Sequence, residues 1–126
     1  MTEPKWLTRQ MLLAIHAEAV WRFGGMRRIR DETLLESAIE RPRNRFHYHP
    51  ESTLFELAAS LGFGLIKNHP YNDGNKRTGL LAMRAFLFLN RYQLEPTEAD
   101  EVETMVGVAE GAVNETMLAE WLESNC

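Results

Sequence analysis

A stretch of ten residues, HPYNDGNKRT at positions 69–78, brings together side chains suited to phosphate chemistry. The imidazole of His69 can accept a proton near neutral pH. The carboxylate of Asp73 is a hard oxygen ligand of the kind that Mg²⁺ prefers. Lys76 and Arg77 carry positive charges that can neutralise phosphate oxygens. We therefore interpret the stretch as a candidate site for phosphoryl or nucleotidyl transfer.

The same stretch is expected to run from a loop directly into a helix. Pro70, Asn72 and Gly74 favour a loop, whereas residues 79–90 are apolar almost without interruption and favour a buried helix. A helix N-terminus presents unpaired N–H groups and a positive dipole end, and both attract anions. Gly74 would let the backbone approach a phosphate closely, and Asn75 supplies an amide donor. The predicted phosphate- and nucleotide-binding residues are Asn72, Gly74, Asn75, Lys76 and Arg77.

Each of these residues also has an explanation without chemistry. Asp73 and Arg77 stand four residues apart, so they could form a helix N-cap with a surface ion pair. His69 could simply cap the preceding helix. The residues alone leave the chemical and the structural interpretations open.

Two segments resemble a known family. The string HPYNDGNKRTG, residues 69–79, resembles the signature of the Fic/Doc superfamily, and the lysine before the arginine is similar to its death-on-curing (Doc) toxin branch. Upstream, LLESAIERP at residues 34–42 resembles the Leu-x-x-Ala-Ile-x-x-Pro element of Doc-like chains. The likeness extends from Leu7 to Glu123. It implies a compact all-α domain over residues 1–126, a bundle of about six helices around a central helix.

The resemblance also implies a function. Doc-type toxins are kinases that move the γ-phosphate of ATP to a threonine of elongation factor Tu, arrest translation and are neutralised by an antitoxin of the Phd type. In this interpretation His69 deprotonates the acceptor hydroxyl and Asp73 holds Mg²⁺ across the phosphates. The expected co-substrate and cofactor are therefore ATP and Mg²⁺, and the expected partners are a Phd-like antitoxin and a translation protein.

Two alternatives come from the same motif. The motif here is similar to that of Fic-type AMP transferases, His-Pro-Phe-x-x-Gly-Asn-Gly-Arg-x-x-Arg. It differs at two positions, because Lys76 replaces the second glycine and Leu80 stands in place of the last arginine. The lysine would crowd the usual phosphate path and the leucine removes a bidentate clamp, so we expect transfer of the γ-phosphate. Arg84 lies seven residues beyond Arg77, about 10 Å further along a helix, and is not expected to replace the clamp. AMP transfer and a non-catalytic nucleotide- or protein-binding module stay open as alternatives.

Composition limits the other possibilities. The chain has 126 residues, enough for one domain, and its formal net charge of −4 argues against direct nucleic-acid binding. It contains neither an apolar run that could span a membrane nor a recognisable signal peptide, so we expect a cytoplasmic protein. The one cysteine, Cys126, fits a reducing compartment.

The rest of the chain predicts the helices that support the motif. Gly62 and Gly64 lie inside an expected helix, which indicates that another helix, residues 75–90, crosses closely. His16 lies on an apolar helix face and is predicted to be a buried core histidine. His47 and His49 are spaced like a metal pair but lack a nearby carboxylate or cysteine, so a mobile loop is expected instead. The expected elements are a helix from Thr8 to Phe23, a short helix from Asp31 stopped by Pro42, an irregular loop over residues 41–52 where the family has a flap, a helix from Ser52 or Thr53 to Asn68, a helix over residues 75–90 at the buried centre, a helix opened by a Thr97–Asp100 capping box through Ala109, and a last helix capped by Asn114.

Overall fold

The computed structural model describes residues 3–23, 29, 31–68 and 74–126. These residues form six α-helices, and none of them lies in a β-strand. The expected all-α bundle of about six helices is therefore confirmed. The helices are α1 (Arg9–Phe23), α2 (Glu32–Tyr48), α3 (Leu54–Asn68), α4 (Asn75–Leu89), α5 (Glu98–Glu110) and α6 (Glu115–Ser124).

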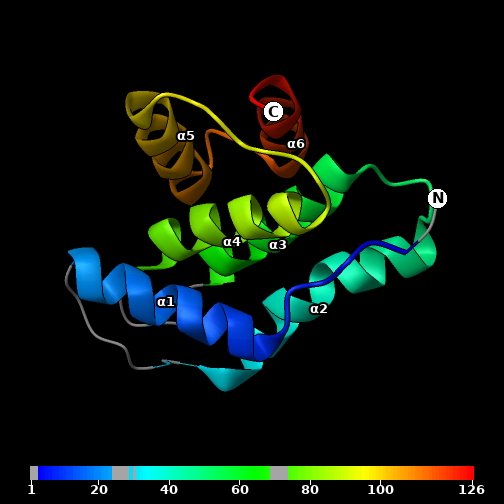
Figure 1. The fold of residues 1–126 in the computed structure, drawn as a ribbon, viewed down its shortest axis with the longest axis horizontal. Coiled ribbons are helices and arrows are strands. Elements are labelled where there is room, and N and C mark those ends of the chain that lie inside the picture. Colours follow the sequence, from blue (N-terminus) through cyan, green and yellow to red (C-terminus); the bar gives the residue numbers. More distant parts are fainter. Residues whose placement is uncertain (1–2, 24–28, 30, 69–73) are drawn as a thin grey trace.

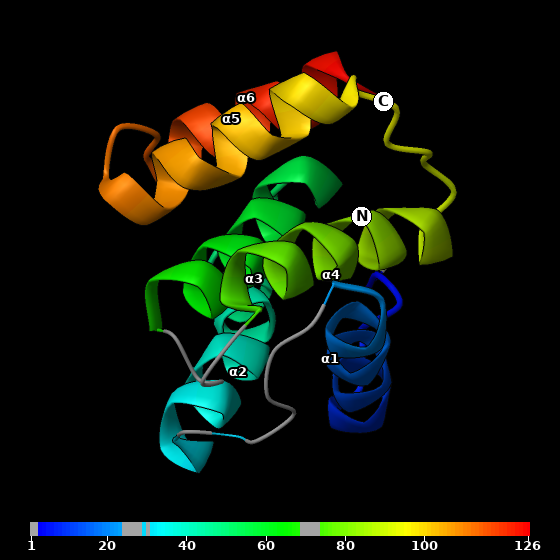
Figure 2. The same cartoon turned by 90° about the vertical axis from the view of Figure 1, so that its left-hand side faces the viewer.

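The helices stack in three layers. Both views show α3 and α4 in the middle, with α1 and α2 on one side of them and α5 and α6 on the other (Figures 1 and 2). The helix α3 packs against α2, α4, α5 and α6. The bundle is thus organised around α3, and α4 shares its centre. Residues 79–90 were expected to be buried all round, but the ring of Phe88 in α4 is 71% exposed.

Side-chain caps start most of the helices where the sequence predicted them. The side chains of Thr8, Asp31, Thr97 and Asn114 each accept the backbone N–H three residues ahead, at 3.1, 3.1, 3.1 and 2.8 Å. Thr53, rather than Ser52, caps α3, and Glu56 returns the bond by accepting the Thr53 N–H at 2.8 Å. These contacts are local in sequence, which is why the pattern of residues predicted them.

The second helix contradicts two predictions. Pro42 was expected to stop it and residues 41–52 were expected to form a loop, yet α2 continues through Pro42 to Tyr48. A proline inside a helix removes a hydrogen bond and costs ~3 kcal/mol. The flap that the resemblance implied is therefore helical over most of its length, and only residues 49–53 are irregular.

Two arginines explain why the helix continues past the proline. Arg41 donates to the carbonyl of Ser60 at 2.7 Å and pairs with Glu115 at 2.8 Å. Arg45, one turn later, pairs with Glu56 at 3.0 Å and with Glu115 at 3.3 Å. These contacts attach the end of α2 to α3 and α6. Tertiary contacts therefore offset the local cost of Pro42.

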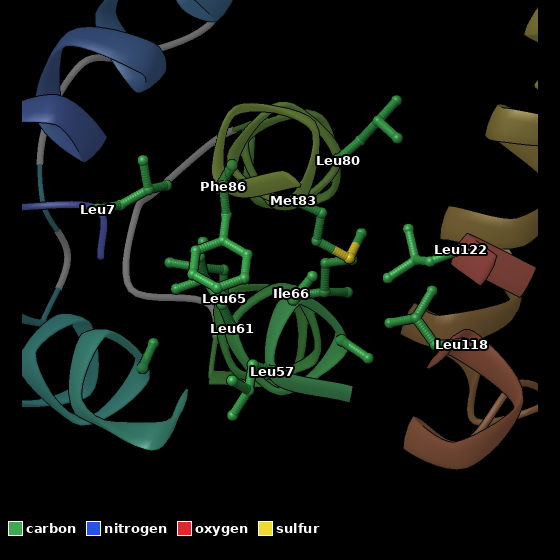
Figure 3. Packing of buried hydrophobic residues seen from close by; sticks show 14 of the residues in the cluster. Leu7, Leu57, Leu61, Leu65, Ile66, Leu80, Met83, Phe86, Leu118 and Leu122 are labelled. Atoms are coloured by element: carbon green, nitrogen blue, oxygen red, sulfur yellow. The ribbon is translucent and has the colours of Figure 1, made fainter. Parts of the chain in front are cut away.

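Small residues let α3 and α4 cross closely, as predicted. A side chain at Gly62 would meet the Sδ of Met83 at 2.2 Å, and one at Gly79 would meet Ile66 at 2.7 Å and the Gly62 carbonyl at 3.3 Å. Figure 3 shows Met83 and Phe86 of α4 directed at α3, with Leu118 and Leu122 of α6 closing one side of the cluster. Gly64 is different, because its nearest backbone contact is the Cα of Ala38 in α2, at 3.3 Å. The prediction was right about close packing at Gly64 and wrong about the partner helix.

Candidate functional site

The predicted site residues divide into two groups. His69, Asn72 and Asp73 lie outside the described residues. Gly74, Asn75, Lys76 and Arg77 form the first turn of α4 and its N-cap. The structure therefore describes four of the five residues that were predicted to bind phosphate or nucleotide, all except Asn72.

Gly74 gives this helix an unusual start. It is the N-cap of α4 and has a left-handed conformation, with φ +80° and ψ 16°. Its carbonyl accepts the N–H of Thr78 at 2.8 Å, which closes the first helical turn. Glycine has no side chain to accept an N–H of that turn, so α4 begins without the oxygen cap that Thr8, Asp31 and Thr53 provide elsewhere. A helix that begins in this way suits an external anion.

The side chains after Gly74 point in different directions. Asn75 is 9% exposed and lies against the protein, whereas Lys76 is exposed and Arg77 is partly buried. The first turn therefore presents one cation to solvent and one close to the protein surface. An anion at the helix end can meet both charges in addition to the helix dipole.

Beyond the first turn of α4, neither Leu80 nor Arg84 provides a second arginine that is available to bind phosphate. Leu80, in place of the last arginine of Fic-type AMP transferases, is 3% exposed and belongs to the core. Arg84 pairs with Glu101 of α5. Its guanidinium thus holds two helices together, consistent with the expectation that it does not replace the clamp.

Two buried polar side chains lie directly behind Gly74. A Cβ built on Gly74 would lie 3.6 Å from the Nε2 of His16 and 3.9 Å from the Oγ1 of Thr78. His16 is 2% exposed and Thr78 is fully buried. The prediction that His16 is buried is confirmed. The sequence did not indicate that its ring would lie beside the N-cap residue of α4, the helix whose start belongs to the candidate site.

His16 lies near Gly74 because α1 and α4 run antiparallel. At one end the N–H of Lys5 donates to the Oδ1 of Asn90 at 2.9 Å, and the Nδ2 of Asn90 donates to the Lys5 carbonyl at 3.0 Å. At the other end the ring of His16 lies beside Gly74. Two residues 58 positions apart in the chain are thus brought close together where α4 begins.

The part of the chain that the structure describes contains no cluster of side chains suited to binding a metal ion. No group of three or more His, Cys, Asp or Glu side chains within it could hold a metal ion, and His47 and His49 form no such group. The predicted Mg²⁺ ligand, Asp73, lies outside the described residues. Mg²⁺ in phosphoryl-transfer sites commonly uses one or two carboxylates together with substrate phosphates, so a single carboxylate is a sufficient protein ligand for this ion.

Among the described residues, none of the helices has both the length and the apolar composition needed to cross a bilayer.

Comparisons with known proteins identify relatives. The sequence model of the Fic/DOC family matches residues 6–87, which include both segments that resembled the family. Protein kinase Doc of Escherichia phage P1 is 31% identical over 117 residues, which cover 92% of this chain and 91% of the phage protein. Toxin Doc of Mycolicibacterium smegmatis is 40% identical over 73 residues, 57% of this chain and 56% of that protein. The predicted relationship is confirmed.

Proposed function

This chain belongs to the Fic/Doc family, and we propose that it is a toxin enzyme that transfers the γ-phosphate of ATP to a serine or threonine hydroxyl of a protein. The observation that carries the proposal is the start of α4, where a helix end capped by glycine is followed by Lys76 and Arg77. The similarity over most of the chain to a protein named as a kinase supports the same chemistry.

The first turn of α4 supplies the charge that phosphoryl transfer needs. Catalysis of this reaction consists mainly of positioning and electrostatic stabilisation, because negative charge is spread over the oxygens of the transferred group. In our proposal the helix N–H groups and Asn75 bind phosphate oxygens. Arg77 binds them with its planar fork of donors, and Lys76 adds a compact charge from the solvent side.

The remaining roles belong to the motif residues outside the described part of the chain. His69 would accept the proton of the acceptor hydroxyl while the oxygen of that hydroxyl bonds to the γ-phosphorus. The bond between that phosphorus and the bridging oxygen then breaks, and ADP leaves. Asp73 would hold Mg²⁺, which when bound neutralises charge on the β- and γ-phosphates.

The residues of α4 favour the kinase over AMP transfer. An AMP transferase of the Fic type has a second arginine at the position of Leu80, and here that position is in the core. The next cation, Arg84, is paired with Glu101. Without an arginine clamp for the outer phosphates, we propose that ATP binds with its γ-phosphate, rather than its α-phosphate, next to His69.

We further propose that elongation factor Tu or another translation protein is the substrate, and that a Phd-like antitoxin neutralises the enzyme. A groove of about 580 Å³ between α1 and α4 is lined mainly by apolar side chains, among them Ile15, Leu81 and the exposed Phe88. The apolar face of an amphipathic antitoxin helix would suit such a groove. The groove lies along α4 from Leu81 to Phe88, so an antitoxin bound in it would have to extend towards the start of the helix to cover the candidate site.

Labelled ATP tests the reaction. The purified protein and its His69→Ala variant are incubated with bacterial lysate, Mg²⁺ and ATP labelled at either the α or the γ position. We expect protein labelling from γ-labelled ATP alone, reduced ~10²–10⁴-fold in the variant because a general base contributes about that factor. Labelling from the α position would establish AMP transfer instead. Binding of ATP without any histidine-dependent labelling would identify a non-catalytic module.

A further inference from the structure

A second pocket lies where α2 ends beside the segment that precedes α1. It has a volume of about 380 Å³ and is lined by Glu3, Trp6, Arg43, Phe46, His47 and Pro50. We propose that this pocket, the Arg43 pocket, binds an acidic peptide segment of a partner protein, in which a carboxylate stands next to an apolar side chain. The inference goes beyond the proposed function and does not depend on it.

The Arg43 pocket is separate from the candidate phosphate site. Its Trp6 stacks on Phe86 near the end of α4, with the ring centroids 5.9 Å apart. Phe86 lies about 18 Å along the helix from Gly74, at 1.5 Å for each residue. Figure 1 shows the segment before α1, in dark blue, running along α2 towards the end of that helix. A ligand in the Arg43 pocket would therefore not occupy the start of α4.

The fold brings the lining residues together from two segments. Arg43, Phe46 and His47 are three and four residues apart, so they share one side of α2. This arrangement requires the helix to continue past its internal proline, as it does. The other wall comes from the segment before α1, whose backbone is fixed by the hydrogen bonds between Lys5 and Asn90.

Trp6 holds the guanidinium of Arg43 against the pocket wall. The Cζ of Arg43 lies 5.8 Å from the centroid of the Trp6 ring, within the range of a cation–π contact. The Trp6 ring is itself packed between two other rings: Phe86, at an interplanar angle of 27°, and Phe46, at 67° with the centroids 5.8 Å apart. Aromatic rings, and not a carboxylate, therefore position this arginine.

Arg43 differs from its neighbours on α2 in having no acidic partner. Arg41 and Arg45 both pair with Glu115. None of the ion pairs between described residues includes Arg43, although Glu3 lines the same pocket. The Nε of Arg43 is buried without a hydrogen-bond partner, which is rare for a buried N–H group. The described part of the chain thus supplies no acceptor for this guanidinium.

The chemistry of the pocket indicates its ligand. Because the Nε of Arg43 is not accessible, a ligand can reach the guanidinium only through its two terminal amino groups. Their fork matches the two oxygens of a carboxylate, and such charged hydrogen bonds are roughly twice as strong as neutral ones. Trp6 and Phe46 add an apolar wall beside the charge, which suits an apolar side chain next to the carboxylate. Tryptophan and arginine are also enriched at the centres of protein interfaces, which favours a polypeptide ligand.

The test follows the indole N–H signals of the three tryptophans by NMR during a titration with the peptide acetyl-Gly-Asp-Phe-Gly-amide. Trp6 lines the pocket, whereas Trp21 and Trp121 do not and serve as internal controls. A matched peptide with asparagine in place of aspartate removes only the charge. Arg43→Gln removes the guanidinium, and Arg91→Gln removes an exposed arginine that does not line the pocket. Thermal unfolding of each variant is recorded.

We expect the aspartate peptide to shift the Trp6 signal until it saturates and to leave the other two indole signals in place. The asparagine peptide, and the aspartate peptide with Arg43→Gln, should each bind at least about tenfold more weakly, because each change removes the charged hydrogen bonds. Arg91→Gln should bind the aspartate peptide as the wild type does. Glu3→Gln should bind it at least as tightly, because a like charge beside the ligand is removed.

A replacement covers the case in which Arg43→Gln does not fold. Arg43→Lys keeps the charge but loses the forked contact, so it should weaken binding of the aspartate peptide about threefold or more.

Four results would overturn the proposal: no shift of the Trp6 signal, equal affinity for the two peptides, wild-type affinity in Arg43→Gln, or an equal loss in Arg91→Gln. Tighter binding of phenyl phosphate than of the aspartate peptide would overturn it as well and assign the pocket to phosphate esters. No ATP is present in this experiment, so failure of the kinase proposal would leave its result unaffected.

Discussion

Two glycines with the same backbone conformation provide a controlled test of the phosphate site. Gly74, at the start of α4, has φ +80°, and Gly111, at the end of α5, has φ +87°. Replacing either with alanine imposes the same backbone penalty, about 1–2 kcal/mol for a left-handed residue with a Cβ. Only Gly74 lies in the candidate site, so the pair separates the effect on folding from the effect on binding.

The surroundings of the two glycines set the expected loss of stability. The nearest atom to a Cβ at Gly74 is the Nε2 of His16 at 3.6 Å, an ordinary van der Waals contact, and nothing lies within 4 Å of a Cβ at Gly111. Neither alanine meets a steric clash. Both variants should therefore lose about 1–2 kcal/mol, which lowers the melting temperature of a domain of this size by roughly 3–10 °C.

The effect on ATP should differ between the two variants. Alanine at position 74 disfavours the left-handed φ, so the chain that precedes position 74, which includes the predicted Mg²⁺ ligand Asp73, should change direction relative to the first turn of α4. We expect Gly74→Ala to weaken ATP binding at least about tenfold and Gly111→Ala to leave it unchanged. Calorimetric unfolding and ATP titration of both variants measure the two effects separately.

Two outcomes would refute this reasoning. Normal ATP binding by Gly74→Ala, with the expected loss of stability, would show that the start of α4 does not bind phosphate. A loss of stability by Gly74→Ala well beyond that of Gly111→Ala would show that the space behind Gly74 is tighter than the contact distances indicate.

The remaining predictions concern the metal, the buried hydroxyl and acid stability. Asp73→Ala should remove most of the Mg²⁺ dependence of ATP binding, and a titration with and without Mg²⁺ that still shows the full wild-type dependence would exclude this carboxylate as the ligand. Thr78→Val should change the free energy of unfolding by less than about 1 kcal/mol, because it deletes a hydroxyl without a partner; a loss of 2 kcal/mol or more in urea unfolding would show that the hydroxyl is paired. The N–H of Thr53, followed by the charge of Arg45, lowers the pKa of the Glu56 carboxyl below its usual 4.5. The resulting stabilisation is fully present above the unfolded pKa and is lost as the pH falls through the lower pKa of the folded state. Because the Glu56 side chain is 38% exposed and solvent screens its charge, Glu56→Gln should cost at most about 0.5–1 kcal/mol at pH 7 and progressively less in acid. An equal difference between wild type and variant at pH 7 and pH 3 would contradict the role of the charge.

The features that the sequence predicted well depend on neighbours a few residues away. The caps at Thr8, Asp31 and Asn114 need only an oxygen and an N–H three residues ahead. The start of α4 after Gly74 followed in the same way from loop formers before an apolar run. Such contacts form whatever the rest of the fold does, so the order of residues is enough to predict them.

The wrong predictions depend on residues far apart in the chain. Pro42 stops an isolated helix, but Arg41 bonds to Ser60 and Glu115, and these partners lie 19 and 74 residues away. The glycine at position 64 predicted close packing but did not indicate that α2 is the partner helix. The position of His16 beside Gly74 likewise requires α1 and α4 to be antiparallel, which no local pattern indicates. Predicting these features would require the arrangement of the helices.

The two ends of α4 have different surroundings, because its later turns lie in the core and its start belongs to the candidate site. Met83 and Phe86, in the second half of α4, are buried in the core. The close approach of Gly79 to Gly62 fixes the crossing of α4 with α3. The axis of α4 is therefore set by the core and cannot adjust to a bound phosphate. What the core leaves open is the direction of the chain that precedes α4, which depends on the φ of Gly74. Because the side chains of His16 and Thr78 are buried beside Gly74, the core and the candidate phosphate site adjoin at this glycine.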